Sequence, residues 1–368
     1  MIKIRNKGVV WGGIITIALL LILSLLVIGC QSTAGPTGPA GPAGSAGAAG
    51  PAGPAGSAGA AGPAGPAGAS AMATDTCSDC HNETTVIKAR QVQWENSLHG
   101  DGFTFERNGT TCAACHTAEG FVISQAAGGV QTLGAAVENP SPINCRTCHD
   151  IHKTGTEKDW ALTVNGPVTI ALTGDTIDLG DGNLCATCHQ PREATGLPVV
   201  GGGDQEITSS RFGPHHGPQA TMLFGIAGYG DYTGSSGHSL IEDTCTTCHM
   251  ASAYGKQSGG HTMSMAYEYH ENEVQNTAGC VSCHSDVEEF NINGALTEIE
   301  ELATELNELL LADGLITASG SAVPGTYTSA QAGALWNYRM VVLEDRSGGV
   351  HNPGYAKFLL ETGIDALK

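Results

Sequence analysis

The chain has 368 residues, 13 cysteines, 14 histidines and only 5% aromatic residues, and its formal net charge is −20. Because 36 acidic residues outnumber 16 basic ones, no basic surface is available to neutralise phosphates, which excludes nucleic acid as a natural partner. The apolar fraction of 41% comes largely from an N-terminal run and an alanine-rich tract. The remainder is therefore poor in the large apolar side chains that build a dense core.

Residues 1–29 are predicted to form a lipoprotein signal peptide. Lys3, Arg5 and Lys7 precede an apolar run over 9–28, and the sequence then reads Val-Ile-Gly-Cys, a lipobox ending at Cys30. The alternative is an uncleaved transmembrane helix, because about 20 apolar residues can cross a bilayer. We favour the signal peptide, which predicts a lipid on Cys30 as the membrane anchor. Since no acidic residue directly follows the cysteine, we expect an exported, outer-membrane lipoprotein exposed at the cell surface.

Residues 35–70 carry glycine at every third position without a break. A collagen triple helix requires this period, because only glycine fits at its crowded axis. Alanine occupies the third position of almost every triplet, so a triple helix of this composition would be only marginally stable. Two interpretations stay open, a monomeric polyproline-like stalk and a homotrimer. In both, residues 30–71 are a spacer between the lipid anchor and the rest of the chain.

Six C-x-x-C-H motifs follow, and they use every cysteine after Cys30. The motifs are Cys77-Cys80-His81, Cys112-Cys115-His116, Cys145-Cys148-His149, Cys185-Cys188-His189, Cys245-Cys248-His249 and Cys280-Cys283-His284. Two thiols three positions apart can each bind one vinyl group of a single haem, and the next histidine then binds the iron. Zinc ribbons and disulfides also use paired cysteines, but neither requires a histidine after every pair. The motifs therefore predict six c-type haems with these histidines as proximal ligands.

Residues 72–368 are too few to keep six haems apart, so we expect the haems to lie close together. The predicted fold class is mainly α with extensive loops and little sheet, wrapped around a haem stack. The haem domain is placed at 72–290, and 291–368 is expected to form helices that pack on it and supply a distal histidine. Apolar residues recur on one stripe over 295–312, with glutamates mostly outside it, and a second helix is predicted over 329–345.

Eight histidines remain once the proximal ligands are assigned. Six of them are the predicted distal ligands: His99, His152, His216, His238, His261 and His351. The two left over are His215, which adjoins His216, and His270, which lies in a polar stretch. Methionine at 222, 263, 265 or 340 is the alternative ligand, disfavoured because histidine is in surplus. Two histidines on every iron predict an electron-transfer protein rather than a substrate-converting enzyme.

Five short markers carry a resemblance to a known superfamily. They are Trp94-x-x-Ser97-x-His99, Cys148-His149-x-x-His152, Pro214-His215-His216-Gly217-Pro218, Gly260-His261-Thr262 and His351-Asn352-Pro353-x-Tyr355. From about Thr76 to its end, the chain resembles the multihaem c-type cytochromes related to bacterial pentahaem nitrite reductases and octahaem enzymes. The resemblance implies that the marker histidines, with His216 preferred over His215, are distal ligands. It departs at the catalytic haem, which those reductases bind through C-x-x-C-K, whereas every motif here ends in histidine.

The signal sequence and spacer resemble those of surface electron-transfer lipoproteins in respiratory bacteria. We therefore expect a hexahaem carrier whose partners are other redox proteins or extracellular electron acceptors. Two alternatives stay open: a reductase of a small nitrogen or sulfur oxyanion with one open haem, and a homopolymeric filament in which a spare histidine binds a haem of the next chain. The acidic surface disfavours steering an anionic substrate inward.

Overall fold

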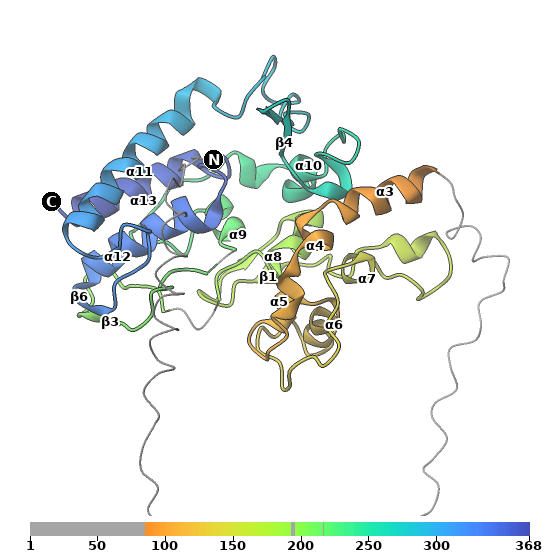
Figure 1. The fold of residues 1–368 in the computed structure, drawn as a ribbon, viewed down its shortest axis with the longest axis horizontal. Helices are drawn as coiled ribbons and strands as arrows, with labels where there is room; N and C mark the ends of the chain where they lie inside the picture. The colour runs from red at the N-terminus through yellow and green to blue at the C-terminus, as the bar shows by residue number, and fades with distance from the viewer. Residues whose placement is uncertain (1–84, 193–195, 216) are drawn as a thin grey trace, which may run out of the picture. The chain divides into compact units, whose positions relative to one another are not determined.

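The chain divides into two units, residues 1–66 and 67–368. A computed structural model describes 85–192, 196–215 and 217–368 (Figure 1), all within the second unit. Several predictions fall outside the described residues: the signal peptide, Cys30, the spacer, the motif Cys77-Cys80-His81, and His216. Among the helices in the three described ranges, none is both long and apolar enough to cross a membrane.

The described part of the second unit is mainly helical with long loops and little sheet, as the sequence predicts. Its α-helices are α3 (Thr85–Glu95), α4 (Leu98–Asp101), α5 (Ala113–His116), α6 (Ala118–Ala126), α7 (Cys145–Cys148), α8 (Asn183–Ala186), α9 (Gln219–Phe224), α10 (Thr244–His249), α11 (Ala295–Ala312), α12 (Ser329–Tyr338) and α13 (Pro353–Asp365). Short 3₁₀ turns are η1 (Phe103–Glu106), η2 (Glu157–Trp160), η3 (Gly180–Gly182), η5 (His238–Leu240), η6 (Gly260–Thr262) and η7 (Ile292–Gly294). The stretch η8 (Arg339–Asp345) is π-helical.

The strands in the described part of the chain form three antiparallel pairs. They are β1 (Val168–Thr169) with β2 (Thr176–Ile177), β3 (Gln205–Ile207) with β6 (Gly325–Tyr327), and β4 (Ala266–Tyr269) with β5 (Asn272–Gln275). The β3–β6 pair joins segments far apart in the sequence, with Glu206 opposite Thr326. The sheets therefore fasten loops and do not form a layer of the fold.

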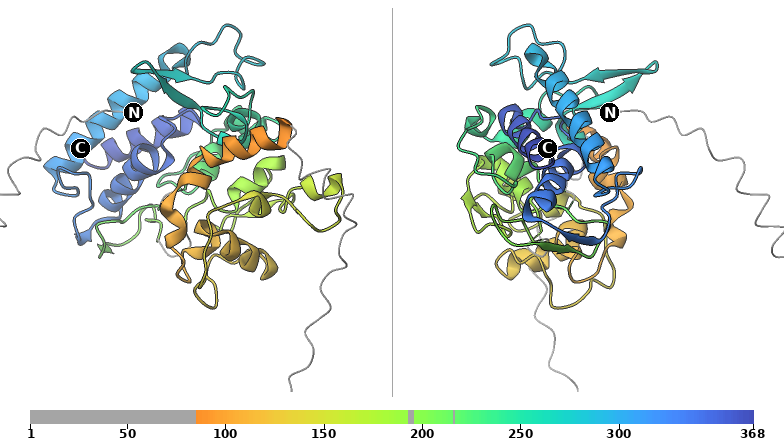
Figure 2. Two further views of the ribbon diagram at one scale, coloured as in Figure 1. Left: turned by 45° about the vertical axis from the view of Figure 1, so that its right-hand side comes forward. Right: turned by 90° about the vertical axis from the view of Figure 1, so that its left-hand side faces the viewer.

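The helices α11, α12 and α13 pack against one another (blue in Figures 1 and 2). The bounds of α11 coincide with the predicted 295–312, and its apolar stripe buries Ile299, Leu306 and Leu310. The predicted helix over 329–345 is also present, but it changes from α to π geometry after Tyr338. These helices supply most of the main apolar core, in which Trp336 is fully buried.

The segments that carry the described motifs have much smaller apolar cores. One cluster of seven buried residues surrounds Ile170 and Leu179, and another of four surrounds Ala113 and Leu133. Long loops connect these clusters. This distribution fits a domain whose interior is completed by bound groups with large apolar faces.

The amide of Asn337 is a buried junction between α12, α13 and the loop at Tyr229. It accepts the Tyr229 N–H at 2.7 Å and donates to the carbonyls of Tyr229 and Leu359 at 2.8 and 3.0 Å. Asn337→Leu would leave the buried N–H and carbonyl of Tyr229 without this partner, each costing about 1–3 kcal/mol, and would remove a second hydrogen bond from the Leu359 carbonyl. We expect the free energy of unfolding to fall by about 2 kcal/mol or more, measured by denaturant unfolding followed by circular dichroism. Asn139→Leu, at an exposed position, is the control; equal losses in both variants would contradict this account.

Candidate haem-binding sites

Each described C-x-x-C-H motif folds as about one helical turn. In four of the motifs the histidine N–H donates to the carbonyl of the first cysteine, at 2.8–3.1 Å. This bond closes the turn at His116, His149, His189 and His284. Residues three apart lie on the same side of such a turn, so both thiols point to one side with the histidine next to them. All ten described cysteines are free of disulfides.

Four of the motif histidines face a second histidine from another part of the chain. The ring centroids are 6.1 Å apart for His99 and His189, 6.4 Å for His149 and His261, 6.2 Å for His238 and His284, and 6.2 Å for His249 and His351. A metal ion bound to one nitrogen of each ring at about 2 Å would separate the centroids by about 6 Å. The spacing of these paired imidazoles would therefore allow both rings of a pair to bind one iron ion.

The second ring nitrogen of most of these histidines is also engaged. In three of them Nδ1 contacts a backbone carbonyl: His149 with Trp160 (2.7 Å), His238 with Val350 (2.8 Å) and His249 with Met263 (2.9 Å). In the other three Nδ1 contacts a side chain: His189 with the Gln219 oxygen (3.1 Å), His351 with the Asp345 carboxylate (2.7 Å) and His99 with the Met263 sulfur (3.1 Å). Nδ1 carries the proton in such contacts, which fixes the ring orientation and leaves Nε2 unprotonated, the form in which it could bind a metal ion.

Local structure around each marker explains how the distal candidates are held. His99 lies on α4, which Ser97 caps by accepting the Gly100 N–H. Trp94, at the end of the preceding helix α3, donates from its indole to the Ile143 carbonyl at 2.9 Å. His261 lies on η6 and is tied to α3, because its N–H donates to the Gln93 side chain at 3.0 Å.

The C-terminal marker positions His351 through a helix cap. Asn352 accepts the Tyr355 N–H at 3.0 Å, and Pro353 occupies the first turn of α13, where a missing N–H costs nothing. Because His351 directly precedes this cap, the start of α13 fixes the ring that faces His249.

Burial keeps several of these imidazoles neutral. It lowers the pKa of His99 to about 4, with a smaller contribution from nearby His189, and it also lowers the pKa values of His249 and His261. Neutral imidazole is the form that binds a metal ion. For His351, burial alone would lower the pKa, but the charge and hydrogen bond of Asp345 outweigh it and raise the pKa.

Four further described histidines lie outside these four pairs: His116, His152, His215 and His270. His152 adopts a φ of 65°, and its N–H donates to the Asp159 carboxylate at 2.9 Å. His270 is exposed in the β4–β5 turn and packs on Tyr269, with ring centroids 4.3 Å apart. His81 and His216 are outside the described residues, so the ligand roles of these two histidines, like those of His116 and His152, stay predictions.

The methionines weighed as alternative ligands have other surroundings. Met222 and Met340 are fully buried in the main apolar core. Met263 instead contacts two histidines, one through its sulfur and one through its carbonyl. Sequence reasoning did not find this role of Met263, nor those of Gln219 and Asp345, because a partner on the Nδ1 side has no characteristic spacing from a haem motif.

The motif at 185–189 lies among three others. A hydrogen bond with the Cys245 thiol, followed by burial, raises the pKa of Cys185 well above its usual value. Likewise a hydrogen bond with Cys115, followed by burial, raises the pKa of Cys188, and the charge of Cys148 acts on both thiols. The motif at 245–249 is in turn close to the motif at 280–284, whose two thiols act electrostatically on Cys248. We call the motif at 185–189 the junction motif.

The chain was compared with protein families, curated proteins and solved structures. No family model matches the sequence. The C-type polyheme cytochrome OmcB of Geobacter sulfurreducens is 29% identical over 140 residues, which cover 34% of this chain and 18% of that protein. The chain thus matches less than a fifth of its curated relative.

Among solved structures, the outer cell wall cytochrome OcwA superposes over 76% of this chain and 50% of that one, with a TM-score of 0.50 and 20% identity. An undecaheme cytochrome from the S-layer of Carboxydothermus ferrireducens covers 76% of this chain and 39% of that one, with a TM-score of 0.42 and 19% identity. The fold and the OmcB similarity agree with the repeated C-x-x-C-H motifs and the facing imidazoles. The chain is therefore a multihaem c-type cytochrome.

Proposed function

We propose that the protein is a hexahaem electron carrier that works at the cell surface, with two histidines on every iron. The observation that supports this best is the set of four facing histidine pairs, whose ring centroids are 6.1–6.4 Å apart. Haem supplies an iron that cycles between two oxidation states. Iron bound on both faces by histidine has no position left for a substrate, so outer-sphere electron transfer is the chemistry that these residues permit.

The spacing of the motifs supports passage of electrons through the protein. The junction motif has thiols beside those of the motifs at 112–116 and 245–249, and within electrostatic range of Cys148. The motif at 280–284 extends the series from 245–249. Electron transfer slows steeply with distance, so neighbouring motifs of this kind provide short steps. The proposed path is branched, with the junction motif at the branch.

The proposed location follows from the N-terminal sequence. A lipid on Cys30 and the spacer at 35–70, acting as a stalk or a trimer, would hold the carrier away from the outer membrane. Similarity in fold to an outer cell wall cytochrome supports an exported role. The net charge of −20 favours partners with basic surfaces or minerals with cation-rich faces.

Two measurements on the purified full chain test this function. Mass spectrometry is expected to show six haems added to the mature polypeptide. Electron paramagnetic resonance of the oxidised protein is expected to show only low-spin iron, because every iron has two strong-field imidazole ligands.

The low-spin signals should fall into two classes, because their anisotropy depends on the angle between the ligand planes. The planes are 34° and 35° apart in the pairs His149–His261 and His249–His351, but 68° and 82° apart in His99–His189 and His238–His284. A high-spin signal that shifts on adding nitrite or sulfite would contradict the carrier and favour the reductase.

A further inference from the structure

The ligand histidines differ in what their Nδ1 atoms contact. Among the six described contacts, three acceptors are backbone carbonyls, one is the Gln219 amide oxygen and one is the Met263 sulfur, all of them neutral. Only His351 donates to a carboxylate, that of Asp345, at 2.7 Å. The series therefore runs from a thioether, the weakest acceptor, to a charged oxygen, the strongest.

Asp345 is held in a setting that strengthens its effect on His351. Its side chain is fully buried, with 0% exposed, and its other oxygen accepts the Ser347 hydroxyl. The two nearest cations along the chain interact elsewhere: Arg346 is exposed and donates to the Leu343 carbonyl at 3.2 Å, and Arg339 pairs with Glu344 at 3.1 Å. Among the described residues, the ion pair that Asp345 makes is with His351. The negative charge is therefore directed at one imidazole in a region that excludes water.

We propose that Asp345 is a positioning residue that gives the iron held between His249 and His351 the lowest reduction potential among the described sites. The proposal rests on the bis-histidine ligation proposed above. A carboxylate on Nδ1 increases the electron density and basicity of the imidazole. A more basic ligand stabilises the oxidised iron, and a buried negative charge nearby opposes adding an electron.

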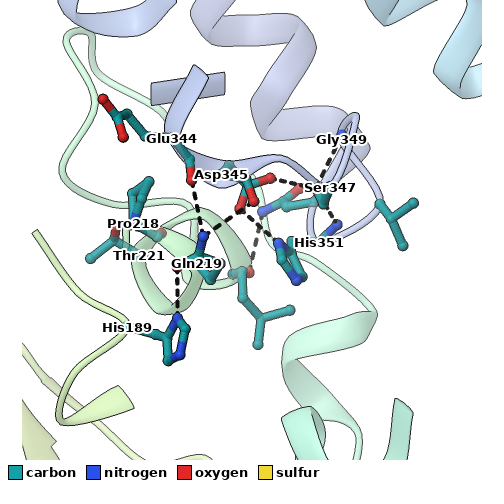
Figure 3. A network of polar contacts seen from close by, with 12 residues as sticks. His189, Pro218, Gln219, Thr221, Glu344, Asp345, Ser347, Gly349 and His351 are labelled. Atoms are coloured by element: carbon teal, nitrogen blue, oxygen red, sulfur yellow. Dashed lines mark hydrogen bonds and ion pairs between the residues drawn. The ribbon is translucent and has the colours of Figure 1, made fainter. Parts of the chain in front are cut away.

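The site of the junction motif, formed by His189 and His99, is expected to have its reduction potential shifted in the opposite direction, upward. His189 donates to the Gln219 oxygen, and the Gln219 amide donates to the carbonyls of Glu344 and Asp345 at 3.0 and 3.2 Å (Figure 3). The second histidine of that site, His99, contacts only the Met263 sulfur through Nδ1. Both acceptors at the junction are neutral, so a higher potential is expected there than at its neighbour. A series of contacts thus joins the two sites: His189 donates to Gln219, Gln219 donates to the backbone carbonyl of Asp345, and the side chain of Asp345 accepts from His351.

Redox titration of the full-length holoprotein, followed by visible absorption, tests the role of Asp345. Asp345→Asn keeps an oxygen that accepts the His351 proton but removes the charge. The midpoint potential of the lowest step is expected to rise. At a fixed applied potential, the ratio of reduced to oxidised iron at that site should increase tenfold or more, which corresponds to about 59 mV for one electron. Asp313→Asn, at an exposed position beyond α11, removes the same charge and should leave every step in place.

Two further variants keep the test decisive. Asp345→Glu retains the charge and is expected to retain the low step. Gln219→Glu places a new carboxylate opposite His189, and it should lower the potential of a second step even if Asp345→Asn assembles poorly. The proposal is overturned if Asp345→Asn, with six haems and low-spin spectra, titrates like Asp313→Asn, or if Gln219→Glu lowers no step.

Failure of this inference is distinguishable from failure of the proposed function. High-spin iron or missing haems in the unmodified protein would contradict the function itself. Unchanged potentials in a fully loaded, low-spin Asp345→Asn variant would reject only the role of Asp345.

Discussion

Replacing His261 with alanine is expected to convert one haem of the purified protein from low spin to high spin. The His261 ring faces His149 with 6.4 Å between centroids, while its backbone N–H is what ties η6 to Gln93. Alanine keeps that backbone bond and removes only the imidazole. The iron bound by His149 would then have one open axial position.

The change is measured by electron paramagnetic resonance and by binding of carbon monoxide to the reduced protein. We expect about one carbon monoxide bound per chain, against none for the unmodified protein, and added imidazole should restore the low-spin signal. His270→Ala is the matched control, because that ring is exposed and contacts Tyr269. If His261→Ala keeps six haems and stays entirely low-spin, the assignment of His261 as a distal ligand is wrong.

Removing the junction motif should slow electron redistribution through the protein by more than an order of magnitude. In Cys185→Ser/Cys188→Ser, one haem attachment site is lost between the motifs at 112–116 and 245–249. The same change at Cys280 and Cys283 removes a motif that adjoins only Cys248 among the described thiol interactions. Both variants lose one haem, but only the first interrupts the branch.

Photochemical injection of less than one electron per chain, followed by transient absorption, measures redistribution. Mass spectrometry confirms that each double variant lacks a single haem, and circular dichroism confirms that α11–α13 remain folded. Equal redistribution rates in the two variants would show that the junction motif is not the branch of the path.

The C-terminal helices illustrate what the sequence can predict. The bounds of α11 follow from a dense apolar stripe with glutamates opposite, a signal that depends only on neighbouring residues. The extent of α12 and η8 together was also predicted, over 329–345, but the change to π geometry at Arg339 was not. The π-helical stretch carries contacts to distant or buried groups, namely the pairing of Arg339 with Glu344 and the donation from Gln219 to the Glu344 carbonyl, and such contacts have no local sequence signal.

The candidate haem sites also have a part that the sequence predicts and a part that it does not. The C-x-x-C-H spacing predicts the attachment cysteines and the proximal histidines, because all three residues lie within one helical turn. The pairing of His249 with His351, by contrast, joins rings about 100 residues apart, and nothing local encodes it. The Nδ1 acceptors are even less visible, since three of the six are backbone carbonyls, which every residue possesses.

The separation in sequence between facing histidines has a thermodynamic consequence. On the proposed ligation, each metal centre becomes a cross-link that closes a long loop, as a disulfide does. In the chain-entropy model a closed loop of about 100 residues stabilises the folded state by about 4–5 kcal/mol, and His149–His261 and His249–His351 both enclose loops of about that length. These two loops overlap, so the second closure ties the C-terminal helices to the motif segments. A chain with modest apolar cores thereby acquires through coordination bonds the cohesion that larger proteins obtain from packing.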